Sequence, residues 1–185
     1  VWGTMAENGW FGLLCPEEDG GLGLGFAEAA VVIEELGGVV APEPFVPAIV
    51  LAGAVLRDSD NPELRRDRIE GLISGTVIPA AAGRETGNEY DPSAISTRAV
   101  PRAGGFAISR TKRFIPAAAG SDAIIVSSIR PEGLALYWVP RDAAGIDLVS
   151  DRAVDETDLG VLTLNDVSVG ADQVVVARDA AAVVA

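Results

Sequence analysis

The side chains that most often carry catalysis are scarce in this sequence of 185 residues. It contains no histidine, one cysteine (Cys15) and one lysine (Lys112). Without histidine there is no Ser-His-Asp triad, no histidine-ligated zinc and no imidazole acid–base chemistry. A single cysteine forms no intrachain disulfide and no Cys-x-x-Cys metal site. The residue counts exclude these classes of active site.

The glycine-rich stretch Gly20–Gly25 is a candidate phosphate-binding loop. It contains no GxxxxGK[ST], and Glu28 stands where a GxGxxG motif needs its third glycine. We interpret the stretch as a tight connection between helices in which glycine adopts positive φ. Cys15 lies in an apolar run with no cationic neighbour to lower its pKa, which indicates a buried, inert thiol.

Two groups of acidic residues are candidate carboxylate sites. The neighbours Glu17 and Glu18 could form a dyad, but adjacent acids usually point apart and stay solvated. A second group lies in a region rich in turn residues: Asp151, Asp155, Glu156 and Asp158. This group lacks the D-x-[DN]-x-[DN]-G spacing of a calcium loop, so a solvated turn is the better interpretation. We expect no metal site, and local chemistry alone points to no enzyme.

The composition indicates a folded, acidic chain. There are 14 basic and 27 acidic side chains, a net charge of −13, and 49% of the residues are hydrophobic. The charge argues against nucleic acid or an anionic membrane as a partner, and the apolar content excludes disorder. The longest charge-free stretches fall short of the roughly 20 residues that span a bilayer. The first residues lack a signal-peptide pattern, so we expect a cytoplasmic protein of a reducing compartment.

The first 75 residues have the pattern of helices. The spacing of Phe26, Ala30, Ile33 and Gly37, with Ala29 and Leu36 beside them, predicts one amphipathic helix that ends at Gly37-Gly38. A second helix is expected over 49–56. A third has clear boundary signals, with Asn61 as N-cap, Pro62 at the first helical position and Gly75 after its end.

After Gly75 the pattern changes to short β-rich runs separated by turn residues. The expected strands are Ala94–Val100, Phe106–Ser109, Ala123–Ser128, Leu134–Val139 and Val161–Asn165. Ala103-Gly104-Gly105 predicts a hairpin turn. The α+β fold expected is a helical domain (1–75) followed by an antiparallel β-barrel domain (76–177). Residues 178–185 are Ala-rich and are expected to begin a further helical domain.

Several segments, taken in order, resemble the acyl-CoA dehydrogenase family. Residues 8–23 read NGWFGLLCPEEDGGLG and resemble its N-terminal signature, which 29–37 (AAVVIEELG) continues. Residues 105–115 (GFAISRTKRFI) resemble the family's G-x-Y-x-L-N-G-x-K-x-W-I stretch. Residues 159–169 (LGVLTLNDVSV) resemble its L-x-x-V-x-F-D-x-V-x-V strand. The resemblance covers nearly the whole chain.

The resemblance implies a subunit with a helical N-terminal domain, a middle β-barrel and a C-terminal four-helix bundle. It implies FAD bound between the barrel and a bundle, partly that of a neighbouring subunit. In the family a glutamate removes the α hydrogen of an acyl-CoA thioester as a proton, and the β hydrogen passes to flavin N5 as a hydride. That glutamate belongs to the bundle, so we expect no catalytic residue in this chain.

Two family loops that contact flavin and substrate are altered here. In the first, T-E-P-x-x-G-S-D, Glu85 falls on the Glu and Asp91 on the Asp, while the Thr, Pro, Gly and Ser are replaced by Arg84, Thr86, Glu89 and Tyr90. In the second, Phe114 stands in place of the Trp that lies over the flavin, and Ile115 follows it. Pro116 replaces a hydroxyl residue and has no backbone N–H to donate. The resemblance implies cofactor contacts for Glu85, Phe114 and Ile115, and a substrate contact for Asp91.

Each of these positions also has a structural interpretation. Phe114 can stack on a ring, but Phe114 and Ile115 could equally be barrel core. Lys112 is better interpreted as a structural ion-pair partner than as a catalytic base. Glu85 and Asp91 could simply order a surface loop.

Three functional hypotheses follow. The chain is part of an FAD-dependent acyl-CoA dehydrogenase subunit, or a degenerate, non-catalytic partner in a hetero-oligomer, or a stand-alone β-barrel ligand-binding module. The family implies acyl-CoA as substrate, a homo- or hetero-oligomer with another acyl-CoA dehydrogenase chain, and an electron-transferring flavoprotein as acceptor. We expect the 185 residues alone to be inactive, because the family's base lies outside them.

Overall fold

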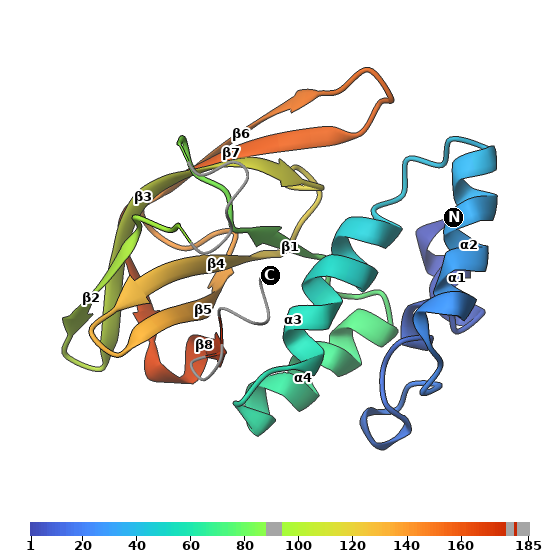
Figure 1. Cartoon of the computed structure of the whole chain (residues 1–185), viewed down its shortest axis with the longest axis horizontal. Helices are drawn as coiled ribbons and strands as arrows, with labels where there is room; N and C mark the ends of the chain where they lie inside the picture. The colour runs from blue at the N-terminus through green and yellow to red at the C-terminus, as the bar shows by residue number, and fades with distance from the viewer. Residues whose placement is uncertain (88–93, 177–179, 181–185) are drawn as a thin grey trace.

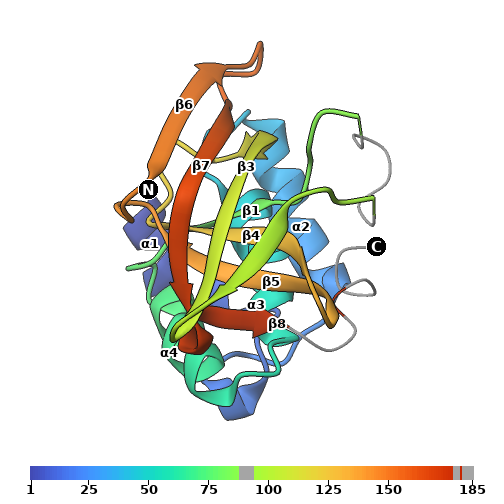
Figure 2. The same ribbon diagram turned by 90° about the vertical axis from the view of Figure 1, so that its left-hand side faces the viewer.

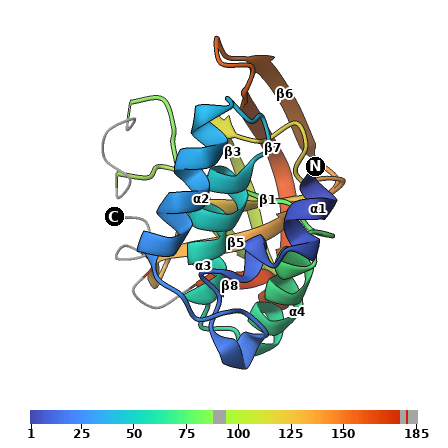
Figure 3. The same ribbon diagram turned by 90° about the vertical axis from the view of Figure 1, so that its right-hand side faces the viewer.

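The chain folds as a layer of helices that covers one face of a curled β-sheet (Figure 1). The computed structural model describes residues 1–87 and 94–176, together with Ala180. The helical layer consists of α1 (Trp2–Glu7), η1 (Trp10–Gly12), η2 (Glu17–Asp19), α2 (Phe26–Gly38), η3 (Phe45–Ala52), α3 (Gly53–Arg57) and α4 (Pro62–Ile73). Seen from the helical side in Figure 3, α2 lies in front of α3. The α+β fold class is confirmed.

Helix α2 has the predicted bounds and buries a stripe that overlaps with the predicted one. Ala29, Val32, Ile33 and Leu36 pack toward the core, a spacing of i, i+3, i+4 and i+7. Phe26, which the sequence analysis placed on the apolar stripe, is 63% exposed. The helix begins with Glu28 accepting the N–H of Gly25 at 2.9 Å. The helix was therefore predicted correctly, with Ala29, Ile33 and Leu36 on or beside the predicted stripe, but the placement of Phe26 on the packed face was wrong.

The other two predicted helices are also present. The segment expected over 49–56 forms a π-helical stretch, η3, that continues directly into α3. Helix α4 starts as predicted, since the Oδ1 of Asn61 accepts the N–H of Leu64 and Pro62 occupies the first turn. Gly75 follows the helix with a φ of 71°, a conformation that favours glycine.

Eight strands follow the helices in one sheet of order β6-β7-β3-β2-β4-β5-β8, with β1 paired to β4. Their bounds are β1 (Pro79–Ala82), β2 (Arg98–Arg102), β3 (Gly105–Pro116), β4 (Ala123–Arg130), β5 (Gly133–Pro140), β6 (Ile146–Arg152), β7 (Asp158–Gly170) and β8 (Val174–Val176). All five predicted strands are present, and Arg102 pairs with Gly105 across the predicted hairpin turn. The sequence analysis missed β1, β6 and β8.

The sequence analysis had expected an antiparallel sheet, but two of the strand pairings are parallel. β1 and β2 both run parallel to β4 and share one of its edges. β1 pairs with the first half of β4, from Ala123 to Val126, whereas β2 pairs with it only at Ile129. The chain leaves the sheet after β1 and rejoins the same edge at β2, which leaves a gap in the pairing at Ser127 and Ser128. The candidate site lies at this gap.

The central hairpin β4–β5 separates two apolar cores. Ile125 and its partner Trp138 face the helices and pack with residues such as Phe11, Phe45 and Leu72. Ile124 and Val126 face the opposite way, toward β3 and β7. Figure 2 shows β7, β3 and β2 crossing in front of β4 and β5. Because both faces of β4 are covered, its sequence is a nearly continuous apolar run.

The glycine-rich stretch is a connection between η2 and α2, as interpreted from the sequence. Gly20 and Gly23 have φ values of 86° and 61°. A Cβ on Gly21 would lie 2.1 Å from the carbonyl oxygen of Cys15, so only glycine fits there. Cys15 is fully buried, and burial raises the pKa of its thiol. The predicted burial of the thiol is confirmed, but Arg57 is a cationic neighbour that the sequence analysis did not expect; its effect on the pKa is smaller than that of burial.

The change from helices to strands falls between the end of α4 at Ile73 and the start of β1 at Pro79. As domain boundaries, residues 75 and 177 stay predictions, and the helix expected over 178–185 lies, apart from Ala180, outside the described residues. Within the described ranges, no helix has the length and apolar character needed to cross a bilayer.

Asn61 allows a test of how α4 is attached to the end of the sheet. Its Oδ1 caps the helix, and its Nδ2 donates to the carbonyls of Asp172 and Val174 at 3.1 and 3.2 Å. We predict that Asn61→Ala lowers the free energy of unfolding by about 2–3 kcal/mol in urea titrations. Asn61→Ser, which keeps a capping oxygen but loses the donor, should lower it by roughly half as much. Equal losses would show that the cap contributes nothing.

Candidate flavin and acyl-CoA site

A buried carboxylate lies at the gap in the sheet. Glu85 is 1% exposed, although it lies just after β1 in a connecting segment. One of its oxygens accepts the backbone N–H of Ser96 at 3.0 Å, and the other accepts that of Thr97 at 3.1 Å. The hydroxyl groups of Ser96 and Thr97 donate to the same two oxygens. The carboxylate thus satisfies backbone groups that have no strand partner at this gap.

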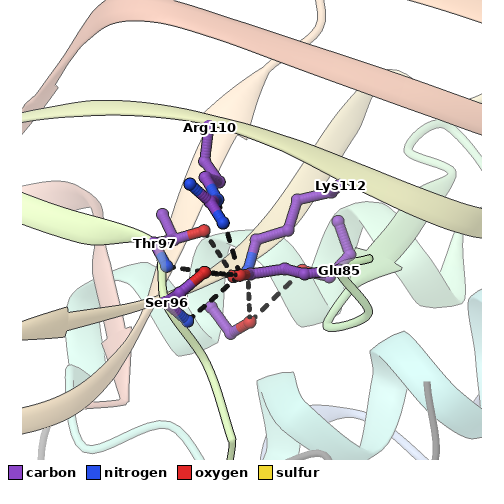
Figure 4. A network of polar contacts seen from close by, with 7 residues as sticks. Glu85, Ser96, Thr97, Arg110 and Lys112 are labelled. Carbon is purple, nitrogen blue, oxygen red and sulfur yellow. Dashed lines mark hydrogen bonds and ion pairs between the residues drawn. The ribbon is translucent and has the colours of Figure 1, made fainter. Parts of the chain in front are cut away.

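Two cations balance this carboxylate (Figure 4). The Nζ of Lys112, on β3, lies 2.7 Å from one oxygen of Glu85, and the Nε of Arg110 lies 3.7 Å from the other. Lys112 is fully buried and also donates to the Oγ of Ser127 at 3.0 Å. The prediction that Lys112 is a structural ion-pair partner is confirmed.

The surroundings shift both pKa values. Burial alone would raise the pKa of Glu85, but hydrogen bonds from Lys112, Ser96 and Thr97 outweigh burial and lower it from 4.5 to about 2. Burial lowers the pKa of Lys112 from 10.5 to about 8, against the opposing effect of Glu85. Near neutral pH both groups are charged, as an ion pair requires.

Next to Lys112, strand β3 contains a one-residue bulge. Lys112 pairs with Leu162 and Ile115 pairs with Gly160, so three steps on β3 match two on β7. Phe114, inside the bulge, has a φ of 53°. The extra residue shifts the alternation of side chains, so Lys112 and Ile115 both point inward while Phe114 is 43% exposed. The guanidinium of Arg113 lies 5.8 Å from the centre of the Phe114 ring.

An open groove of about 1140 Å³ lies where β3 ends. Its walls come from the segment between α2 and η3, from η3 itself, from the β3–β4 connection at Pro116 and from the turn between β6 and β7. The apolar lining includes Val40, Val46, Leu51 and Val154. The rim is mainly acidic: Glu43, Asp151, Asp155, Glu156 and Asp158, with Arg152 as the cation.

The structure separates the residues that the sequence analysis had grouped as one site. Glu85 lies in the connection between β1 and β2, but its side chain is enclosed by protein groups and bonds the other end of that connection. Ile115 is fully buried in the core, so only its backbone could face a ligand. Phe114 is exposed and available to a ring. Asp91, like Glu89 and Tyr90, lies outside the described residues. As ligand contacts, all four predicted residues remain proposals.

The sequence analysis did not predict the groove. Its helical wall reads as ordinary apolar helix, and the acidic rim was interpreted only as a solvated turn. A cluster of prolines, Pro42, Pro44 and Pro47, was the available signal for an irregular wall in this region. Within the described ranges, no three Cys, Asp or Glu side chains are arranged to hold a metal ion.

Comparison with known proteins places this fold in one class. Residues 1–76 match the family model for the acyl-CoA dehydrogenase N-terminal domain. Acyl-CoA dehydrogenase FadE27 of Mycobacterium tuberculosis is 25% identical over 182 residues, which cover 98% of this chain and 47% of that protein. The helical layer and curled sheet thus define an acyl-CoA dehydrogenase type of fold.

Solved structures agree. The ChsE4–ChsE5 complex from Mycobacterium tuberculosis aligns with a TM-score of 0.86 and 25% identity, over 98% of this chain and 48% of that one. A glutaryl-coenzyme A dehydrogenase in complex with glutaryl-CoA aligns with a TM-score of 0.87 and 25% identity, over 98% and 49%. The resemblance to the acyl-CoA dehydrogenase family that the sequence indicated is confirmed by these comparisons. It spans about half the length of the relatives that it matches.

The two ends of the ion pair should differ in their effect on stability. We predict that Glu85→Gln lowers the free energy of unfolding by about 3–5 kcal/mol, because a buried ammonium loses its counter-charge. Lys112→Met should cost less, since Glu85 keeps its hydrogen bonds from Ser96 and Thr97. The double variant should be more stable than Glu85→Gln. Urea titration of the three variants checks this order, and a less stable double variant would contradict it.

The low pKa of Glu85 also predicts a pH dependence. Its carboxylate is ionised in the folded chain down to about pH 2, whereas the unfolded chain takes up the proton near 4.5. Its stabilisation is therefore complete above pH 4.5 and is lost as the pH falls toward 2. The slope should be about 1.4 kcal/mol per pH unit in this window. Glu85→Gln/Lys112→Met should lack this contribution, which urea titrations at pH 2.5–5 would show.

Proposed function

We propose that this chain forms the N-terminal and middle parts of an FAD-dependent acyl-CoA dehydrogenase subunit. The reaction would be the α,β-dehydrogenation of an acyl-CoA thioester. The observation that carries the proposal is the exposed ring of Phe114, held outward by the bulge on the strand that ends at the groove. A partly exposed aromatic ring in a left-handed backbone conformation offers a face on which another flat ring could stack.

The residues around the bulge fit an aromatic cofactor in part. Phe114 offers a face on which a flat ring could stack, and Ile115 could contribute only backbone groups. Pro116 offers neither a hydroxyl nor an N–H. Glu85 would support the site without contacting the cofactor, because its carboxylate is already enclosed by protein groups. Asp91 stays a proposed substrate contact on the resemblance alone. FAD, when bound, would supply the hydride acceptor.

The groove suits the acyl part of a substrate better than its coenzyme A part. Its lining is apolar, so it would desolvate an alkyl chain or ring. Its acidic rim would repel the phosphates of coenzyme A. The family's glutamate base lies outside these residues, so the chain's own part is to bind, orient and exclude water.

A degenerate partner subunit is the second candidate. Pro116 favours it, because a flavin-bonding hydroxyl is absent there. The likeness to a complex of two named chains, ChsE4 and ChsE5, also supports it. In either case we propose an oligomer with another acyl-CoA dehydrogenase chain, with an electron-transferring flavoprotein as the family's expected acceptor.

The first test is the ratio of flavin to polypeptide in the purified protein, with every copurifying chain counted. We predict one FAD per copy of this chain for a working subunit and one per pair of unlike chains for a shared site. Absence of flavin from all preparations, even after incubation with FAD, would contradict both a working subunit and a shared site.

A matched pair of substitutions tests the role of Phe114. We predict that Phe114→Ala weakens FAD binding by about tenfold, from the loss of aromatic stacking. Phe26→Ala removes an exposed ring at the start of α2, 63% exposed against 43% for Phe114, and should leave FAD affinity unchanged. Titration of FAD fluorescence measures both. Equal affinities in the two variants would exclude Phe114 from the flavin site.

A further inference from the structure

The connection between β1 and β2 is closed at its neck by a carboxylate. Glu85 lies three residues after β1, and Ser96 and Thr97 lie directly before β2. We call these three residues the loop neck. The N–H groups of Ser96 and Thr97 donate to Glu85, and the carbonyl of Thr97 accepts the N–H of Ile129 on β4 at 2.8 Å. The neck is therefore fixed to the sheet where strand pairing stops.

The loop neck is also attached to the bulge of β3. The Nζ of Lys112 bonds Glu85 at 2.7 Å, and the N–H of Arg113 donates to the carbonyl of Arg84 at 3.0 Å. These two contacts join consecutive residues of β3, Lys112 and Arg113, to consecutive residues after β1, Glu85 and Arg84. Phe114 comes next on β3. A movement of the neck would therefore be transmitted directly to the residue before Phe114.

Burial excludes ligand contact for this pair. Glu85 and Lys112 are enclosed, whereas the exposed ring lies two residues further along β3. A buried ion pair adds little net stability compared with well-packed apolar residues. It does impose one geometry, because both charges must stay within hydrogen-bond distance to offset their desolvation. The pair is thus suited to fixing the position of its neighbours.

We propose that Glu85 and Lys112 are positioning residues that couple the loop neck to Phe114, so that the two sides of the flavin site keep one relative placement. This inference rests on the proposed function and deepens it. It assigns the buried pair to the orientation of the Phe114 ring. Loosening the pair should release the ring while the rest of the fold is retained.

The test follows the ring directly. The protein, with any copurifying chain, is labelled with fluorinated phenylalanine, and the Phe114 signal is assigned in ¹⁹F NMR with Phe114→Leu. We call Glu85, with its hydrogen bonds and its ion pair to Lys112, the clamp. Two variants loosen the clamp without leaving a buried unpaired charge: Glu85→Gln/Lys112→Met, which leaves only the half-exposed Arg110 without its partner, and the milder Thr97→Val, which removes one hydroxyl donor to Glu85. The control is Arg102→Gln, which removes an exposed ion pair to Asp166 at the far end of β3. FAD affinity is measured on all four proteins.

We expect the Phe114 signal to shift or broaden in both clamp variants while Phe11 and Phe45, in the helical core, keep theirs. FAD affinity should fall by about tenfold in the double variant and stay unchanged in the control. An unmoved Phe114 signal in the folded double variant would overturn the proposal. So would wild-type FAD affinity in a variant whose ring has moved.

Two further outcomes stay interpretable. If circular dichroism shows the double variant to be unfolded, Thr97→Val decides in the same way. If the wild-type protein binds no FAD, the proposed function fails, and the ¹⁹F signals recorded without FAD still decide whether the pair positions the ring.

Discussion

The middle of the sheet depends on the hydrogen bonds and the ion pair of one buried carboxylate, that of Glu85. Two strands, β1 and β2, share one edge of β4, and the chain between them must leave the sheet and return. Backbone groups at such a break lose their partners, and burying them unpaired would be costly. Glu85 supplies the missing acceptors, but its own charge then needs Lys112. The hydrogen bonds at the sheet break, the β1–β2 connection and strand β3 therefore all depend on this one carboxylate.

The bulge of β3 places an exposed aromatic ring next to this buried ion pair. In a regular strand Lys112 and Phe114 would point to the same side. One additional residue lets Lys112 reach inward to Glu85 and Ile115 enter the core, while the ring of Phe114 faces out. The unfavourable φ of Phe114 must be held by the contacts on both sides of it. An ion pair below and a packed isoleucine beyond provide such contacts.

The sequence predicted those features of the fold that depend on neighbouring residues. The cap and proline of α4, the hairpin turn before Gly105 and the apolar runs of β4 and β5 all depend on neighbouring residues. The packed stripe of α2 depends on which core lies beneath it, so the helical period alone placed Phe26 on that stripe although its side chain is 63% exposed. Strand β1 reads PAAA and has no β-branched residue, so only its pairing with β4 makes it a strand. The resemblance brought Glu85 and Phe114 to attention, but the bulge that gives them different roles has no sequence signal. The groove was missed because its walls come from segments more than a hundred residues apart.

The burial of Lys112 has a chemical consequence for the whole chain. It is the only lysine among 185 residues, and in the folded state its side chain has no contact with solvent. Reagents that acylate lysine amines, and enzymes that attach groups to them, therefore find no lysine on the native surface. A molecule becomes reactive at this position only after the clamp around Glu85 has opened. The rate at which Lys112 is acylated thus reports how often the sheet break opens.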